Sequence, residues 1–197
     1  EKQYYLINNG NQNNTNKNKS VYAHNKGYSE YQVIAIDDKG YQSFANEPIV
    51  FIPKKDESIY ETENFAAESS LRYKGFSGKG FIEISKLKNT QFSIPVIIKK
   101  DGMYAIDFRY ANGNGPTNTE NKCAIRTLII DGKKSGTFIF PQRGVDEWSN
   151  WGFSNPVHVY LKKGKHIILL SFETYDENMN VNINQAMLDY LQITKIQ

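Results

Sequence analysis

The sequence holds one cysteine, three histidines and no long apolar run. The lone Cys123 cannot close an internal disulfide, and no histidine stands near a cysteine pair at the spacing of a zinc site. No stretch approaches the roughly 18 apolar residues that span a bilayer. These shortages exclude a disulfide framework, make zinc a poor candidate and give no reason to expect a transmembrane helix.

An excess of charge of one sign is also missing. The 24 basic and 21 acidic residues leave a formal net charge of +3, and the basic residues are scattered along the chain. Proteins that bind nucleic acids usually gather lysine and arginine into a patch or stripe. We therefore expect no nucleic acid partner.

Catalytic motifs are absent as well. No G-x-S-x-G elbow occurs, and acidic pairs such as Asp176-Glu177 stand in loop-like stretches, where charge is usually solvated. His158 and His166 fall in alternating strand patterns, which are more typical of surface or core positions than of general bases. The sequence predicts no catalytic residue.

What the chain has instead is a succession of short strand patterns. Beyond about Glu57, alternating apolar and polar residues predict strands at 58–65, 80–85, 90–98, 102–111, 124–132, 136–141, 157–161, 166–173 and 187–194. Turn signals such as Asp131-Gly132 separate neighbouring runs, and helical periodicity is nearly absent. This organisation predicts an all-β fold built as an antiparallel β-sandwich or barrel.

The beginning of the chain follows a different pattern. Residues 4–7 predict a short strand, and the Asn-rich tract at 8–20 predicts a loop or disorder because it has almost nothing to bury. Residues 31–37 alternate as a half-buried strand does, and Asp38-Lys39-Gly40 predicts a turn into a second strand. The stretch 31–51 resembles the last two strands of a fibronectin type III domain.

A proline and a charge cluster at 53–56 predict the boundary between two regions. We expect a partial fibronectin type III-like β segment at 1–53. A complete sandwich is expected at 54–197.

Two acidic residues at the start of the second region suggest a metal site. Glu61 and Glu63 are two apart on a predicted strand, so both carboxylates would project from one face and repel each other unless a cation neutralises them. Asp189 lies in the final strand, which in a jelly roll often pairs with the first. Three carboxylates would suit a hard cation such as calcium, although glutamates at this spacing often simply face solvent.

The second region carries a series of phrases in a defined order. They are Y-E-x-E-N from residue 60, G-F-S-G-x-G-F-I from 75, G-M-Y-x-I-x-F-R-Y-A-N-G from 102, L-I-I-D-G from 128, V-x-V-x-L-x-x-G-x-H from 157 and L-D-Y-L-x-I from 188. Together they resemble carbohydrate-binding modules of families 6 and 35. The resemblance implies a jelly-roll sandwich that binds polysaccharide without catalysis and belongs to a secreted bacterial glycoside hydrolase or related enzyme. It also implies a structural calcium ion (Ca2+) held by Glu61, Glu63 and Asp189.

Aromatic residues are the first candidates for sugar contact, since sugar rings present apolar C–H faces. Trp148 and Trp151 lie in one polar loop, and Trp148 is the better ligand candidate because Trp151 precedes a strand that returns to the core. In the related modules the cleft lies at one end of the sandwich, and its second ring would correspond to Phe81. Phenylalanine lacks the hydroxyl of the tyrosine that is often found there.

Polar candidates come from two other loops. Tyr110 and Asn112 stand where a strand enters a Gly-rich loop. Met187 occupies the position where the families usually have an asparagine, so the hydrogen-bonding role would pass to Asn184 or Gln185.

Two alternatives share the predicted fold. The sandwich could be a structural, spacer or adhesion module, or an accessory domain that completes the catalytic cleft of a glycosidase. Exposure of Trp148 beside polar side chains would favour sugar binding, whereas burial of both tryptophans would favour a spacer. The expected partners are a polysaccharide or oligosaccharide and a catalytic domain of the same parent chain, in a secreted, periplasmic or cell-surface location.

Overall fold

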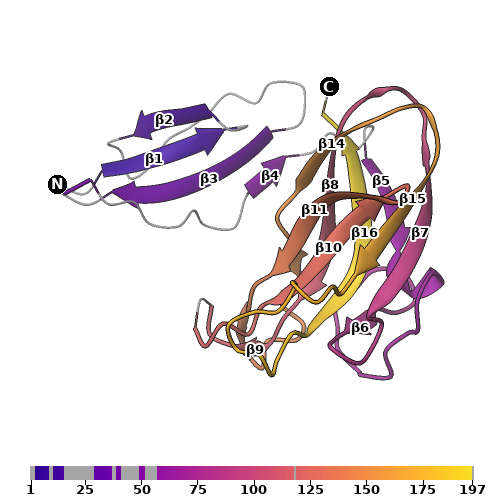
Figure 1. Cartoon of the computed structure of the whole chain (residues 1–197). Coiled ribbons are helices and arrows are strands. Elements are labelled where there is room, and N and C mark those ends of the chain that lie inside the picture. The colour runs from indigo at the N-terminus through magenta and orange to yellow at the C-terminus, as the bar shows by residue number, and fades with distance from the viewer. Residues whose placement is uncertain are drawn as a thin grey trace. The chain divides into compact units, whose positions relative to one another are not determined.

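A computed structural model of the chain describes residues 3–8, 11–15, 29–36, 39–40, 49–51, 57–117 and 119–196 (Figure 1). The chain divides into two compact units, and the division falls between Glu57 and Ser58. Within the described ranges, no helix is long and apolar enough to cross a membrane.

The N-terminal unit is a four-stranded antiparallel sheet of order β2-β1-β3-β4. Its strands are β1 (Gln3–Asn8), β2 (Asn11–Thr15), β3 (Ser29–Ile36) and β4 (Ile49–Phe51). The strand expected directly after Gly40 falls outside the described residues. The fibronectin type III interpretation of this unit stays a prediction.

Strand β2 corrects the expectation of a loop or disorder for residues 11–15 of the Asn-rich tract, whereas residues 16–20 lie outside the described part of the chain. Asn8 pairs with Asn11 and Tyr4 with Thr15, so β1 and β2 form a hairpin. Backbone hydrogen bonds in such a ladder require no apolar side chains, so a polar tract can still form a strand. The low hydrophobicity of the tract therefore misled the prediction.

Over its described residues, the C-terminal unit is all-β apart from one 3-10 turn, η2 (Thr62–Asn64). Its strands are β5 (Glu57–Glu61), β6 (Ile82–Ile84), β7 (Gln91–Ile98), β8 (Gly102–Ala111), β9 (Asn114–Gly115), β10 (Ala124–Ile130), β11 (Lys133–Phe140), β12 (Gly144–Val145), β13 (Gly152–Phe153), β14 (Val157–Leu161), β15 (Gly164–Ser171) and β16 (Ala186–Lys195). The strands predicted from alternation all appear. The sequence missed β9, β12 and β13, which are short pairings inside loops.

These strands form a sandwich, which confirms the predicted fold class. One sheet has the order β11-β10-β15-β7, and the other has the order β13-β8-β16-β5, with β14 paired to β8 and β6 paired to β16. The expected neighbourhood of the first and last strands of the domain is also confirmed, because β5 lies beside β16.

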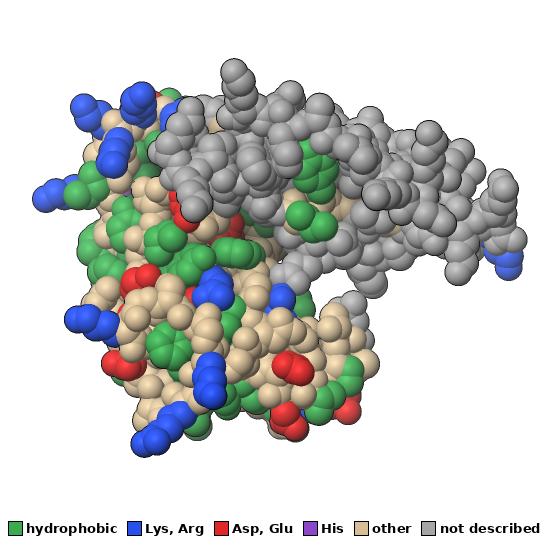
Figure 2. All heavy atoms as spheres, turned by 180° about the vertical axis from the view of Figure 1, so that it is seen from behind, with side chains coloured by type: hydrophobic (Ala, Val, Ile, Leu, Met, Phe, Trp, Pro, Cys, Tyr) green, Lys and Arg blue, Asp and Glu red, His purple; other side chains and the backbone are tan. Residues whose placement is uncertain are grey.

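On the face drawn in Figure 2, the acidic and basic side chains of the described residues are interspersed and do not gather into one patch of either sign.

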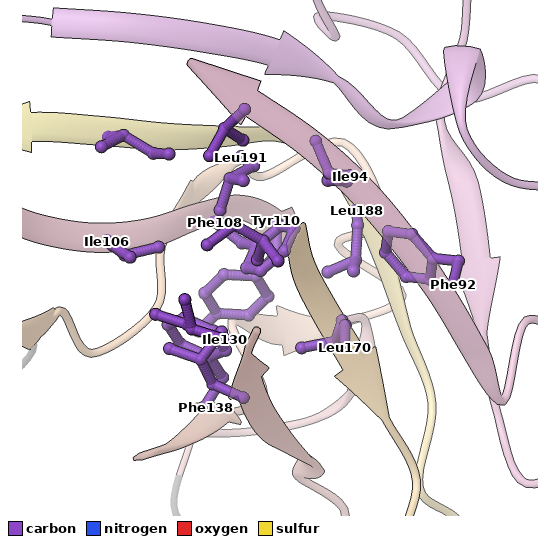
Figure 3. Close-up of a cluster of buried hydrophobic side chains, with 14 of the residues drawn as sticks. Phe92, Ile94, Ile106, Phe108, Tyr110, Ile130, Phe138, Leu170, Leu188 and Leu191 are labelled. Atoms are coloured by element: carbon purple, nitrogen blue, oxygen red, sulfur yellow. The ribbon is translucent and has the colours of Figure 1, made fainter. Parts of the chain in front are cut away.

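The core lies between the two sheets (Figure 3). Strand β7 alternates strictly, with Phe92 and Ile94 pointing inward and their neighbours exposed. They meet Phe108 and Leu188 from the opposite sheet. Burial of each such side chain contributes about 1.5–3 kcal/mol, so the alternation fixes which face of each strand points inward.

Several loops gather at one end of the sandwich. The ends of β8, β6 and β16 meet there, because Met187 pairs with both Ala111 and Glu83. The Asn112 side chain donates to the Phe140 carbonyl at 2.9 Å, which joins the end of β8 to the end of β11 in the other sheet. This loop-rich end, near β6 and β9 in Figure 1, carries most of the residues singled out by the sequence.

Candidate functional site

Five aromatic rings gather at this end, and we call them the aromatic cluster: Tyr73, Phe76, Phe81, Trp148 and Trp151. Phe81 is buried together with Ala111 and Met187, and the other four rings are partly buried against them. Phe81 is thus the floor of the cluster and not the second exposed ring that the sequence suggested. A stacked pair of partly exposed rings lies beside it.

That pairing joins Tyr73 and Trp148. Their ring centroids are 5.7 Å apart, and their planes differ by 11°. Tyr73 also stacks on Phe81 at 5.8 Å, while Trp151 meets Phe81 edge-on at 5.6 Å. Two partly exposed rings of similar orientation therefore stand on a buried apolar floor.

The orientation of Trp148 is set by the loop beneath it. A Cβ built on Gly113 would lie 2.8 Å from three atoms of the five-membered ring of the indole, so that ring packs directly against the backbone at Gly113. The loops that carry Gly113 and Trp148 are also joined by a hydrogen bond, in which the Asp146 N–H donates to the Gly113 carbonyl at 2.9 Å. Within the second loop, the Trp148 N–H donates to the Asp146 carbonyl at 2.9 Å. Only glycine leaves room for this contact.

Trp151 is fixed by different partners. Its indole N–H donates to the Lys74 carbonyl at 2.7 Å, and the Lys74 N–H donates to the Ser149 hydroxyl at 3.0 Å. Trp151 is half-buried, so it lies at the margin of the core. Both tryptophans keep part of their surface exposed.

Polar side chains adjoin the aromatic cluster. Gln185 donates to one oxygen of the Glu83 carboxylate at 2.9 Å, and Lys88 donates to the other at 2.7 Å. Glu83 lies on β6 opposite Met187, which belongs to the buried floor of the cluster. Burial raises the pKa of the Tyr73 hydroxyl, and the negative charges of Glu83 and Asp146 raise it further. Of these residues the sequence had singled out only Gln185 for sugar contact.

Three other predicted contacts lie inside the fold. Tyr110 belongs to the core, whereas Asn112 and Asn184 are buried with their polar atoms engaged. Asn112 donates to two carbonyls and accepts from the Asn114 N–H, and Asn184 accepts from the Ile125 N–H. The structure places them beneath the loops and not at the surface where the sequence analysis expected them.

Glu61, Glu63 and Asp189 form a second group, which we call the carboxylate cluster. The premise that both glutamates share a strand is wrong, because β5 ends at Glu61 and Glu63 lies in the 3-10 turn. The two carboxylates nevertheless converge on Gly78, where an added Cβ would lie 2.5 Å from Glu63 Oε1 and 3.0 Å from Glu61 Oε2. Ser77 joins the group, since its hydroxyl lies 2.8 Å from both Glu61 oxygens and its N–H donates to Asp189 at 2.9 Å.

Asp189 reaches this group through a β-bulge. Leu188 pairs with Tyr110 and Tyr190 with Arg109, so Asp189 is an extra residue without a partner on β8. Its carboxylate forms an ion pair with Arg109. The bulge turns the Asp189 side chain away from the core, as bulges near functional sites often do.

The buried hydroxyl of Thr62 holds the bulge in place. Its oxygen lies 2.8 Å from the Leu188 carbonyl oxygen and 2.7 Å from that of Asp189. Thr62, which lies between Glu61 and Glu63, therefore holds β16 in place at Asp189.

The carboxylate cluster presents carboxylate oxygens, which are the ligand type that calcium prefers. Burial raises the pKa of Glu61, an effect opposed by the Ser77 hydrogen bond and reinforced by Asp189 and Glu63. Within the described part of the chain, Glu63 Oε2 is buried without a hydrogen-bond partner. Carboxylate oxygens left partly unneutralised suit a hard cation. Among these described residues, however, no three His, Cys, Asp or Glu side chains stand in a ready metal-binding arrangement, and the cation facing Asp189 is Arg109.

Comparison with known proteins places this unit among sugar-associated folds. No family model matches the chain. A cycloisomaltooligosaccharide glucanotransferase of Niallia circulans is 30% identical over 141 residues, which are 70% of this chain and 13% of that protein. A second such enzyme of the same organism is 26% identical over 118 residues, 58% of this chain and 11% of that protein. The chain thus corresponds to a small part of these curated relatives.

Solved structures show the same likeness. A cycloisomaltooligosaccharide glucanotransferase of Paenibacillus sp., complexed with cycloisomaltoheptaose, matches with a TM-score of 0.54 and 23% identity over 71% of this chain and 18% of that chain. A family 35 carbohydrate-binding module from Clostridium thermocellum matches with a TM-score of 0.52 and 19% identity over 70% of this chain and 96% of that module. The C-terminal unit therefore has the fold of a family 35 carbohydrate-binding module, as the sequence phrases implied.

Proposed function

We propose that residues 58–195 form a non-catalytic carbohydrate-binding module whose ligand lies on the aromatic cluster. The observation that carries this proposal is the nearly parallel pair of Tyr73 and Trp148, partly exposed above a buried floor. Aromatic surfaces of this kind receive the C–H faces of sugar rings. The adjacent Gln185, Glu83 and Lys88 supply donors and acceptors for sugar hydroxyls.

The exposure of the tryptophans favours this function over a structural spacer. A spacer would gain nothing from partly exposed indoles beside polar side chains, whereas a binding surface requires them. An accessory domain that completes a neighbouring catalytic cleft would use the same surface. This alternative differs from the proposed function only in requiring a second domain beside the ligand.

The relatives suggest the first ligands to test. We infer that isomaltooligosaccharides are candidates, because similar chains belong to cycloisomaltooligosaccharide glucanotransferases and one of these is complexed with cycloisomaltoheptaose. The parent protein would then be a secreted bacterial glycoside hydrolase or a related enzyme, and its catalytic domain would be the intramolecular partner.

We also propose that the carboxylate cluster holds a structural calcium ion. Glu61, Glu63 and Asp189 would be its ligands, and the ion would neutralise their mutual repulsion. A ligand that binds only the folded state raises the melting temperature, so excess EDTA should lower it. Glu63→Gln should weaken that response, and a wild-type melting temperature unchanged by EDTA would refute the proposal.

Sugar binding can be tested by affinity electrophoresis and calorimetry with isomaltooligosaccharides, followed by a broad glycan array. Trp148→Ala should abolish retention. Tyr160→Ala is the matched control, because Tyr160 is an exposed aromatic residue on β14, opposite Met103 near the other end of β8. Absence of wild-type binding to every glycan would contradict the proposed function.

A further inference from the structure

Arg109 on β8 lies between the carboxylate cluster and the aromatic cluster. One terminal nitrogen of its guanidinium pairs with Asp189, and the other donates to the Gly75 carbonyl at 3.0 Å. The guanidinium carbon also lies 5.6 Å from the centre of the Trp151 ring and 5.8 Å from that of Tyr190. One side chain therefore contacts both clusters.

The loop that Arg109 contacts, residues 73–80, carries parts of both clusters. Tyr73 at its start belongs to the aromatic cluster, whereas Ser77 binds two of the three carboxylates. Between these residues, the Lys74 carbonyl accepts the indole N–H of Trp151. A displacement of this loop at one cluster would therefore also displace residues of the other cluster.

We propose that Arg109 is a positioning residue for sugar binding, which holds the 73–80 loop and the Trp151 ring in place and links them to the carboxylate cluster through Asp189. The inference rests on the proposed function, since it concerns the same sugar surface. Arg109 itself acts without touching the ligand.

The geometry requires arginine in particular. A guanidinium is planar and has donors on separate nitrogens, so it binds a carboxylate and a carbonyl at once while its face lies against aromatic rings. A lysine ammonium is a point charge and would keep the pairing with Asp189 at most. Arg109→Lys therefore preserves the charge and removes the hydrogen bond to Gly75 and the stacking on Trp151.

The test compares Arg109→Lys with wild type and with Arg72→Lys, which makes the same change at an exposed arginine of the neighbouring segment. The sugar Kd is measured by calorimetry with isomaltooligosaccharides, well below the melting temperature of each variant. We expect Arg109→Lys to weaken binding about fivefold or more, in the range of ordinary coupling between sites, and Arg72→Lys to leave it unchanged. A residue that only stabilises the fold would leave the Kd of the folded protein unaltered.

A second readout is independent of sugar. In a Trp148→Phe background, Trp151 is the sole indole, and its emission should shift when Arg109 is replaced by lysine. If the lysine variant does not fold, Arg109→Gln replaces it, because the shorter neutral side chain loses the ion pair with Asp189 and the contact with Trp151 while all three carboxylates stay in place.

The outcomes separate the two proposals. Weakened binding with a shifted emission supports the positioning role. An unchanged Kd overturns it while leaving the proposed function intact. If the wild-type protein binds no glycan, the proposed function fails, and the role of Arg109 in sugar binding fails with it. An unshifted emission shows, independently of sugar, that Arg109 does not hold the Trp151 ring in place.

Discussion

The contact between Gly113 and Trp148 gives a prediction whose sign depends on a second residue. Gly113 is not among the glycines with a positive φ, so alanine is compatible with its backbone. At such positions Gly→Ala usually stabilises a protein by about 0.4–1 kcal/mol, because it reduces the freedom of the unfolded chain. Here the new methyl group would lie 2.8 Å from three atoms of the Trp148 ring.

The clash outweighs that gain. Ordinary contacts begin at 3.4 Å, so the ring would have to retreat by about 0.6 Å, the difference between that distance and 2.8 Å. Tyr73 stacks against the Trp148 ring, and the Trp148 backbone N–H donates a hydrogen bond to the Asp146 carbonyl. Overpacking of this kind costs about 1–3 kcal/mol, so Gly113→Ala should destabilise the protein by roughly 1–2 kcal/mol and weaken sugar binding.

Urea denaturation and calorimetric titration with sugar measure the two effects. The control is the same substitution in a Trp148→Ala background, where the obstructing ring is gone. There Gly113→Ala should become neutral or stabilising by up to about 1 kcal/mol. A destabilisation of equal size in both backgrounds would refute the contact, and so would wild-type sugar affinity in the single variant.

Further predictions concern the bulge and a surface ion pair. Thr62→Val removes the hydroxyl that lies against the two bulge carbonyls and should cost about 1–3 kcal/mol in urea denaturation, while Thr62→Ser should recover most of it; equal stability of the valine variant would contradict this role. Burial lowers the pKa of His166, but hydrogen bonds to the Lys162 carbonyl and to Asp131 outweigh it, so the net pKa is raised above 6.5. The His166–Asp131 pair therefore stabilises the fold below about pH 6.5 and loses this effect as the pH rises through the raised pKa. Because Asp131 is half exposed, the change in the free energy of unfolding should not exceed about 0.5 kcal/mol. His166→Gln should abolish this pH dependence in a pH series of denaturation curves.

Strand alternation made the fold predictable. Phe92 and Ile94 point inward because one face of β7 packs on the core, a local pattern that the sequence displays directly. The pairs β9–β12 and β13–β8 have only two residues in the shorter strand, which is too little for periodicity to register. Their existence depends on loops that meet in space.

The candidate site was predictable by residue type but not by placement. Trp148 and Gln185 were expected at the surface, and they lie there or at its margin. Tyr73 escaped notice because it stands in a loop without periodicity, and Glu83 because an acidic residue between two apolar ones reads as an exposed strand position. Buried asparagines such as Asn112 satisfy loop carbonyls, and an exposed asparagine looks the same in sequence.

By itself the sequence determined the sandwich, since alternation decides which side of each strand is buried. Its order of phrases also drew attention to Glu61, Glu63 and Asp189, whose role as calcium ligands stays a prediction. Tertiary structure alone decided how they meet. Glu63 leaves the strand for a 3-10 turn, and Asp189 is the extra residue of a bulge, so their approach to Glu61 depends on Ser77, Gly78 and Arg109 from other segments. Such contacts arise only when distant parts of the chain are folded together, and a linear pattern does not contain them.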